Sequence, residues 1–146
     1  MCGKQIEEEI HKRIAHHDYH AVFSWGACFH FALKLHELFQ HRLAYCPSLY
    51  ENSHIGHVWA RKDNNKAIDI NGILDEELLI RINNGGCKNI AIEISPDEVR
   101  SHLKNRDYTD TLNARLFELA ECIIKTHERF TSAAPTSNML AKLFTN

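Results

Sequence analysis

Three residues that together can make a nucleophile occur in the first half of the chain: Cys28, His57 and Asp69. A thiol attacks a carbonyl carbon as the thiolate, so a catalytic cysteine needs surroundings that lower its pKa and a base that carries its proton. The base in turn needs a group that orients it. The chemistry of such a set is attack on an amide or thioester carbonyl through a covalent thioester.

The cysteine stands where a helix is expected to begin. Apolar residues recur at i, i+3, i+4 and i+7 from Cys28 to about His41, which predicts one buried helix face. That face consists of Cys28, Phe31, Ala32, Leu35, Leu38 and Phe39. The first turn of a helix offers unpaired N–H groups and partial positive charge, which lower a cysteine pKa and can stabilise an oxyanion. The opposite face, expected to be solvated, carries His30, Lys34, Glu37 and His41.

The histidine and the aspartate fall in two β-rich runs, residues 55–61 and 66–72, which predict a hairpin. The residues between the runs include Asp63-Asn64-Asn65. If these three form the loop, with the last in the left-handed conformation, Lys62 pairs with Lys66.

This register decides whether the aspartate can reach the histidine. It places Trp59 opposite Asp69, so that His57, Trp59, Asp69 and Asn71 share one face. Asp69 then lies diagonal to His57, within side-chain reach. A two-residue loop would turn Asp69 to the opposite face, so the proposed set of residues makes a prediction about register.

Three short motifs resemble a known family. Gly26-Ala27-Cys28-Phe29-His30-Phe31-Ala32 resembles the "GQCWVFA" segment of transglutaminases, His57-Val58-Trp59 resembles their "HVW" strand, and Ile68-Asp69 resembles the strand that follows. The wider papain-like and transglutaminase-like group, which includes arylamine N-acetyltransferases and peptide N-glycanases, shares this order. Over residues 24–73, the resemblance implies Cys28 as nucleophile, His57 as general base and then acid, and Asp69 as the orienting group.

The resemblance also implies a cysteine hydrolase or acyltransferase that acts on a protein or peptide without a cofactor. Ala27 stands where transglutaminases have glutamine, which favours protease- or deamidase-type hydrolysis over amine crosslinking. Transglutaminase- or N-acyltransferase-type transfer remains an alternative, as does a non-catalytic binding module with the same fold. The candidate cleft residues are Trp25, Gly26, Ala27, Phe29, Gly56, Trp59 and Asn71. The second oxyanion donor is left open among His54, Gln40 and His36.

A metal site is the other chemistry that the sequence raises. The candidate ligands are His16, His17 and His20 together with Cys28 or Asp18, because imidazoles one helical turn apart meet on one face. A structural metal normally needs four convergent ligands, and this stretch is interpreted as a loop, so no metal is expected. These histidines are expected to line the rim of the site or to face solvent.

The elements that must position these residues follow from the remaining patterns. Helices are predicted over 4–17, 73–83, from Pro96 onward and over 109–130, a strand over 89–94, and connections over 16–27 and 46–53. The expected fold is α+β, with a small antiparallel sheet packed against helices as in a papain-like/transglutaminase-like core. Residues 1–130 are expected to form a single catalytic domain, and 131–146 a linker and a short C-terminal helix that packs on it.

Composition bounds the remaining possibilities. The formal net charge is −2 without a basic stripe, which argues against nucleic-acid binding. No apolar run reaches the ~18–20 residues of a membrane span, and the first residues are too polar for a signal peptide, so a cytoplasmic protein is expected. The five cysteines form no CxxC pair, and Cys87 and Cys122 are interpreted as core residues.

Overall fold

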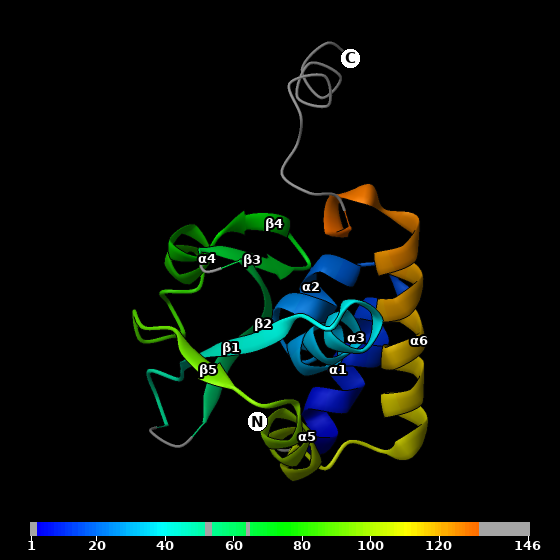
Figure 1. Ribbon diagram of the computed structural model, residues 1–146. Helices are drawn as coiled ribbons and strands as arrows, with labels where there is room; N and C mark the ends of the chain where they lie inside the picture. Colours follow the sequence, from blue (N-terminus) through cyan, green and yellow to red (C-terminus); the bar gives the residue numbers. More distant parts are fainter. Residues whose placement is uncertain (1–2, 52–53, 64, 132–146) are drawn as a thin grey trace.

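The computed structural model describes residues 3–51, 54–63 and 65–131, and these residues form six α-helices and a five-stranded sheet (Figure 1). The helices are α1 (Gly3–Ala15), α2 (Tyr19–Ser24), α3 (Cys28–Phe39), α4 (Glu76–Ile82), α5 (Pro96–Asn105) and α6 (Asp110–Thr126). The strands are β1 (Arg42–Pro47), β2 (Ile55–Asp63), β3 (Lys66–Asp69), β4 (Gly72–Asp75) and β5 (Ile92–Ile94). A 3-10 turn, Glu128–Phe130, follows α6.

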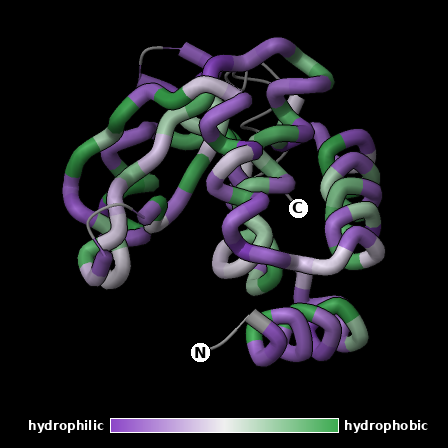
Figure 2. Tube along the Cα trace, turned by 90° about the horizontal axis from the view of Figure 1, so that it is seen from below, coloured by the Kyte–Doolittle hydropathy of each residue, from purple (hydrophilic) through white to green (hydrophobic). Residues whose placement is uncertain are grey.

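The sheet has the order β4-β3-β2-β1-β5 and is antiparallel throughout. Both faces of its central strand are buried: Val58 and Ala60 join the larger apolar cluster with α3 and α6, whereas Trp59 joins a smaller one with α4. Figure 2 shows polar and apolar residues alternating along the helices, as expected for helices that each bury one stripe. The expected α+β class with an antiparallel sheet is therefore confirmed.

The hairpin between β2 and β3 has the predicted parity but a different loop. Ala60 pairs with Ile68 and Arg61 with Ala67, the register that leads to Trp59 opposite Asp69. At the loop end, however, Asp63 pairs with Lys66 and the register shifts between Arg61 and Asp63, so the expected Lys62–Lys66 pair is wrong. A bulge adds one residue to one strand. The extra residue in β2 compensates for the one residue that the loop lacks. Asp69 therefore lies on the face of the sheet that was predicted for it.

Several predicted boundaries are wrong for local reasons. The connection expected over 16–27 contains α2, whose first turn is capped where Asp18 accepts from the N–H of Ala21 at 3.3 Å. Strand β1 begins at Arg42, directly after the expected helix and where no element was predicted, and it ends at Pro47, within the stretch 46–53 that was predicted to be a connection. The helix expected over 73–83 begins as β4 and becomes helical at Glu76. The helix expected over 109–130 ends at Thr126.

The largest correction concerns the face of α3 that was expected to be solvated. His30 is fully buried there, and its Nε2–H donates to Oδ1 of Asn113 on α6 at 2.8 Å. Its ring also packs edge-on against Phe117, and the side chain of Lys34 is only 12% exposed. The cause is α6, which covers this face, so that α3 is buried on two sides between the sheet and α6.

The cysteines divide differently from the expectation as well. Cys87 is buried as predicted, but Cys122 on α6 is exposed. None of the helices in the described part of the chain is long and apolar enough to cross a bilayer. The linker and short helix expected over 131–146 lie, from residue 132 onward, outside the described residues.

Candidate active site

Cys28 is the first residue of α3, and the helix end before it is left open. The preceding residue, Ala27, provides no side-chain cap, whereas α2, α5 and α6 are capped by Asp18, Ser95 and Thr109 respectively. A capping side chain would occupy N–H groups of the first turn. With alanine in that position, the N–H groups next to the thiol remain available to a negatively charged atom.

His57 connects the thiol to a carboxylate. Its Nε2–H donates to Oδ2 of Asp69 at 2.9 Å, and both side chains are almost fully buried. The imidazole also lies close enough to the thiol of Cys28 for each group to shift the pKa of the other. Since Nε2 is bonded to Asp69, the ring nitrogen left for the thiol is Nδ1, which is buried and has no hydrogen-bond partner among the described residues. The structure thus brings Cys28, His57 and Asp69 together.

The pKa values of the thiol and the imidazole move in opposite directions. Burial raises the pKa of Cys28, but the hydrogen bond and charge of His57, the charge of Arg106 and the N–H of Val58 together bring it below its ordinary value. Burial lowers the pKa of His57, but hydrogen bonds with Asp69 and Cys28 and their charges raise it to about 10. Both shifts therefore favour the thiolate of Cys28 beside the imidazolium of His57.

A series of hydrogen bonds supports the carboxylate of Asp69 in addition to its bond with His57. The backbone N–H of Asn71 donates to Oδ1 of Asp69 at 2.8 Å, and its side-chain amide donates to Oδ2 at 3.3 Å. His20 on α2 donates from Nε2 to Oδ1 of Asn71 at 2.7 Å, and the hydroxyl of Ser24 donates to its Nδ1 at 3.4 Å. Sequence reasoning missed this role of His20, because no spacing relates it to a residue 51 positions away.

A cavity of about 210 Å³ borders the thiol. Its lining includes Trp25, Gly26, Cys28, Phe29, Gly56 and Arg106. Trp25 is 40% exposed beside it, whereas Cys28 retains 6% exposure, so the sulfur lies at the inner end. Of the candidate cleft residues, Trp25, Gly26, Phe29 and Gly56 border this cavity.

The other three cleft candidates lie elsewhere. Ala27 and Trp59 are fully buried, and the indole N–H of Trp59 donates to Oε1 of Glu76 at 3.0 Å. Asn71 is exposed beside Asp69, in the series of hydrogen bonds described above. Trp59 therefore anchors α4 to the sheet, and Asn71 supports the carboxylate.

Two glycines at the cavity are required by close approach. A Cβ on Gly26 would lie 2.9 Å from Cδ1 of Ile10, so its small size lets α1 pack against the start of α3. A Cβ on Gly56 would lie 2.6 Å from the sulfur of Cys87. Both positions exclude any larger residue without movement of a neighbour.

Two further buried thiols, those of Cys46 and Cys87, lie close to β2 near His57. The sulfur of Cys46 lies 3.9 Å from the carbonyl oxygen of His57. Hydrogen bonding between Cys46 and Cys87 raises the pKa of Cys46 and lowers that of Cys87. Sequence reasoning assigned Cys46 to a loop and did not relate the two, because their proximity depends on the bridge between Ser48 and Cys87.

Of the three candidates for the second oxyanion donor, two lie far from the thiol and one lies beside the neighbouring cavity. Gln40 follows the last residue of α3, and His36 bonds to the carbonyl of His41, both at the end of the helix opposite to Cys28. His54 borders a second cavity, which shares Phe29 and Arg106 with the first. Arg106 borders both cavities, and the sequence contains no motif that would have identified it.

No group of three side chains suited to hold a metal ion is found in the described part of the chain. Comparison with models of protein families, with curated proteins and with solved structures found no match. The roles of these residues are therefore argued from their geometry and chemistry.

Proposed function

We propose that this chain is a cysteine-nucleophile enzyme with a papain-like/transglutaminase-like core, which hydrolyses an amide or thioester of a protein or peptide through a thioester at Cys28. The observation that carries the proposal is the position of His57, which is bonded to Asp69 at 2.9 Å and lies close enough to the thiol of Cys28 to lower its pKa. The three motifs that resemble transglutaminases, in the same order along the chain, support it.

In the first step the sulfur attacks the carbonyl carbon. A C–S bond forms, and the electron pair of the C=O bond moves to oxygen, where the open N–H groups at the start of α3 stabilise the charge. His57 then donates its proton to the leaving nitrogen or sulfur as that bond breaks. The product is an acyl group in thioester linkage to Cys28.

In the second step His57 acts as a base. It removes a proton from water, which attacks the thioester carbonyl, and the acid is released with Cys28 again a thiolate and His57 again protonated. Asp69 keeps the imidazole oriented through both steps, and a general acid or base of this kind contributes about 10²–10⁴-fold.

The proposal is tested by intact-mass spectrometry after treatment with a peptidyl vinyl sulfone. We expect one adduct on the wild type and on Cys122→Ala, which removes an exposed thiol outside the site. Cys28→Ala should remain unlabelled and His57→Ala should label far more slowly. Unchanged labelling of Cys28→Ala would remove the enzyme proposal, and labelling of Cys122 as fast as that of Cys28 would favour a binding module.

A further inference from the structure

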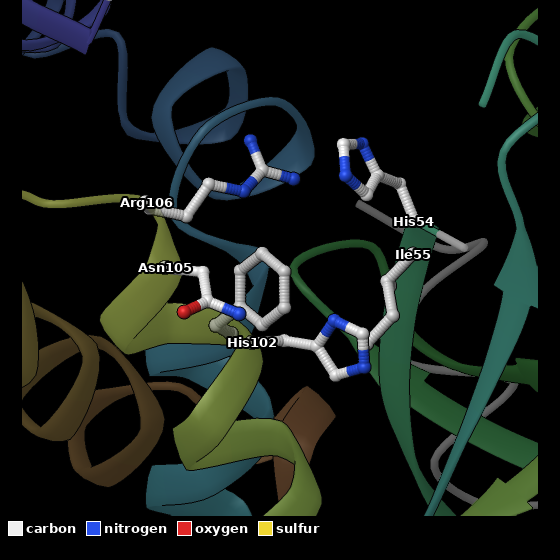
Figure 3. A pocket seen from close by; sticks show the side chains of 6 residues that line it. His54, Ile55, His102, Asn105 and Arg106 are labelled. Carbon is white, nitrogen blue, oxygen red and sulfur yellow. The ribbon is translucent and has the colours of Figure 1, made fainter.

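A second cavity of about 360 Å³ adjoins the one at Cys28. Its lining residues are Phe29, His54, Ile55, His102, Asn105 and Arg106, and the first cavity shares Phe29, Ile55 and Arg106 with it. Figure 3 shows that it lies between the end of α5 and the start of β2, with Arg106 and His54 facing one another across it. A molecule held at Cys28 can therefore extend into this second space.

Arg106 gives this space an uncompensated positive charge. Its guanidinium lies 5.0 Å from the centre of the Phe29 ring and hydrogen-bonds with Tyr108, but no carboxylate among the described residues forms an ion pair with it. By contrast, Arg61 and Arg100 pair with Glu76 and Asp97. An arginine that borders two cavities beside a nucleophile is thus held by an aromatic face and a phenol, and its charge is left for a ligand.

The other lining residues fit the same ligand. Asn105 and His102 provide polar groups on the Arg106 side, whereas Phe29 and Ile55 provide apolar contacts for a methylene chain. His54 faces Arg106 across the cavity and is paired with Glu51. The guanidinium fork matches a carboxylate, with which it forms paired, charge-assisted hydrogen bonds.

We infer that the cavity at Arg106 binds a carboxylate of the substrate, so that the enzyme acts on acyl groups that carry a carboxylate a few bonds from the reacting carbonyl. This inference rests on the proposed function, because it takes Cys28 as the group that receives the acyl chain. It assigns the carboxylate to Arg106, with His102 and Asn105 beside it, and the intervening chain to Phe29 and Ile55.

The test compares two p-nitrophenyl esters of equal chain length, the monoadipate and the hexanoate, which differ at the far end by a carboxylate and a methyl group. Release of p-nitrophenolate reports acylation of Cys28. The kcat/KM for the adipate is divided by that for the hexanoate, and this ratio is corrected for intrinsic reactivity by dividing it by the ratio of the second-order rate constants of the two esters with N-acetylcysteine. Because any change in the thiolate fraction of Cys28 affects both esters equally, the ratio reports recognition of the carboxylate.

We expect the wild type to prefer the adipate by roughly tenfold, the effect of one charge-assisted hydrogen-bonded pair at a partly exposed site. Arg106→Gln should abolish the preference, and Arg106→Lys should retain part of it. Lys104→Gln, an exposed control near the end of α5, should keep the wild-type ratio. His102→Gln, expected to reduce the preference, provides a second variant if Arg106→Gln does not fold.

The outcomes separate the two proposals. Cys28-dependent release from both esters without preference in the wild type would overturn the carboxylate site and leave the proposed function standing. A preference that survives in Arg106→Gln would likewise overturn it. Failure of either ester to react in a Cys28-dependent way would contradict the proposed function itself, and the inference would fall with it.

Discussion

The molecule contains two buried histidines in nearly the same situation, His30 on α3 and His57 on β2. Each donates from Nε2 to a side-chain oxygen of another element, Asn113 at 2.8 Å and Asp69 at 2.9 Å. Each also has a buried Nδ1 without an oxygen or nitrogen partner among the described residues. Yet the pKa of His30 is lowered to about 4, whereas that of His57 is raised to about 10.

The partner accounts for the difference. Burial lowers the pKa of both imidazoles, because it disfavours the charged form. For His30 the amide of Asn113 offsets burial only in part. For His57 the carboxylate of Asp69 and the thiol of Cys28 outweigh it. One imidazole is therefore neutral at pH 7 and the other protonated, because a carboxylate and a thiol stand beside His57 where an amide stands beside His30.

The largest effect on the acylation rate is expected when the partner of His57 is changed to an amide, like the partner of His30. Asp69→Asn gives His57 the kind of partner that His30 has, so its pKa should fall below 6.5 and the thiolate should lose its imidazolium. We expect the acylation rate of Cys28 by p-nitrophenyl hexanoate at pH 7 to fall about 100-fold or more. Asp75→Asn is the control, since Asp75 pairs with Lys66 at the exposed end of β4. A loss of less than about threefold would mean that His57 does not depend on its carboxylate.

The next largest effect is expected in the pH dependence of folding stability, through His30. The unfolded chain binds a proton at His30 near pH 6.5, whereas the folded protein does so only near 4, so stability falls as the pH falls between these values. At about 1.4 kcal/mol for each pKa unit, the loss is on the order of 3 kcal/mol. Glutamine can still donate to Asn113 but does not titrate, so His30→Gln should lose less stability over this range.

Urea denaturation at pH 6.5 and pH 4 measures this loss for each variant. His11→Gln, which replaces an exposed histidine of α1, serves as the matched control and should behave like the wild type. Equal acid sensitivity of His30→Gln and the wild type would show that His30 is not the group responsible.

The smallest effects are expected behind Asp69. Asn71→Ala removes one side-chain donor but keeps the backbone N–H bond, so the acylation rate should fall by roughly threefold to tenfold. His20→Ala should cost less, and the double variant should match Asn71→Ala alone, because His20 acts through Asn71. His16→Ala is an exposed control. Additive losses in the double variant would show that His20 acts by another route.

What the sequence could predict depended on local pattern. The helix that begins at Cys28 and the strands around His57 and Asp69 follow from short-range periodicity, and the structure contains them. The face on which Asp69 lies was predicted correctly, but from a three-residue loop that the hairpin does not have. A shorter loop together with a bulge gives the same pairing of the strands beyond the bulge. Parity alone does not distinguish these two arrangements.

What the sequence could not predict comes from distant segments. The burial of His30 depends on α6, and the support of Asp69 depends on His20, 51 residues before Asn71. Arg106 reaches the cavities from the end of α5. Periodicity within one helix does not reveal which other element covers its polar face, so such contacts appear only once the chain is folded.

The central claim is that Cys28 is a thiolate held beside protonated His57. The most direct test is the rate constant for alkylation of Cys28 by iodoacetamide between pH 4 and pH 10, followed by peptide mapping. We predict that alkylation of Cys28 reaches its plateau at a lower pH than alkylation of the exposed Cys122 of the same molecules, because the pKa of Cys28 is lowered. A Cys28 profile that coincides with that of Cys122 would contradict the account.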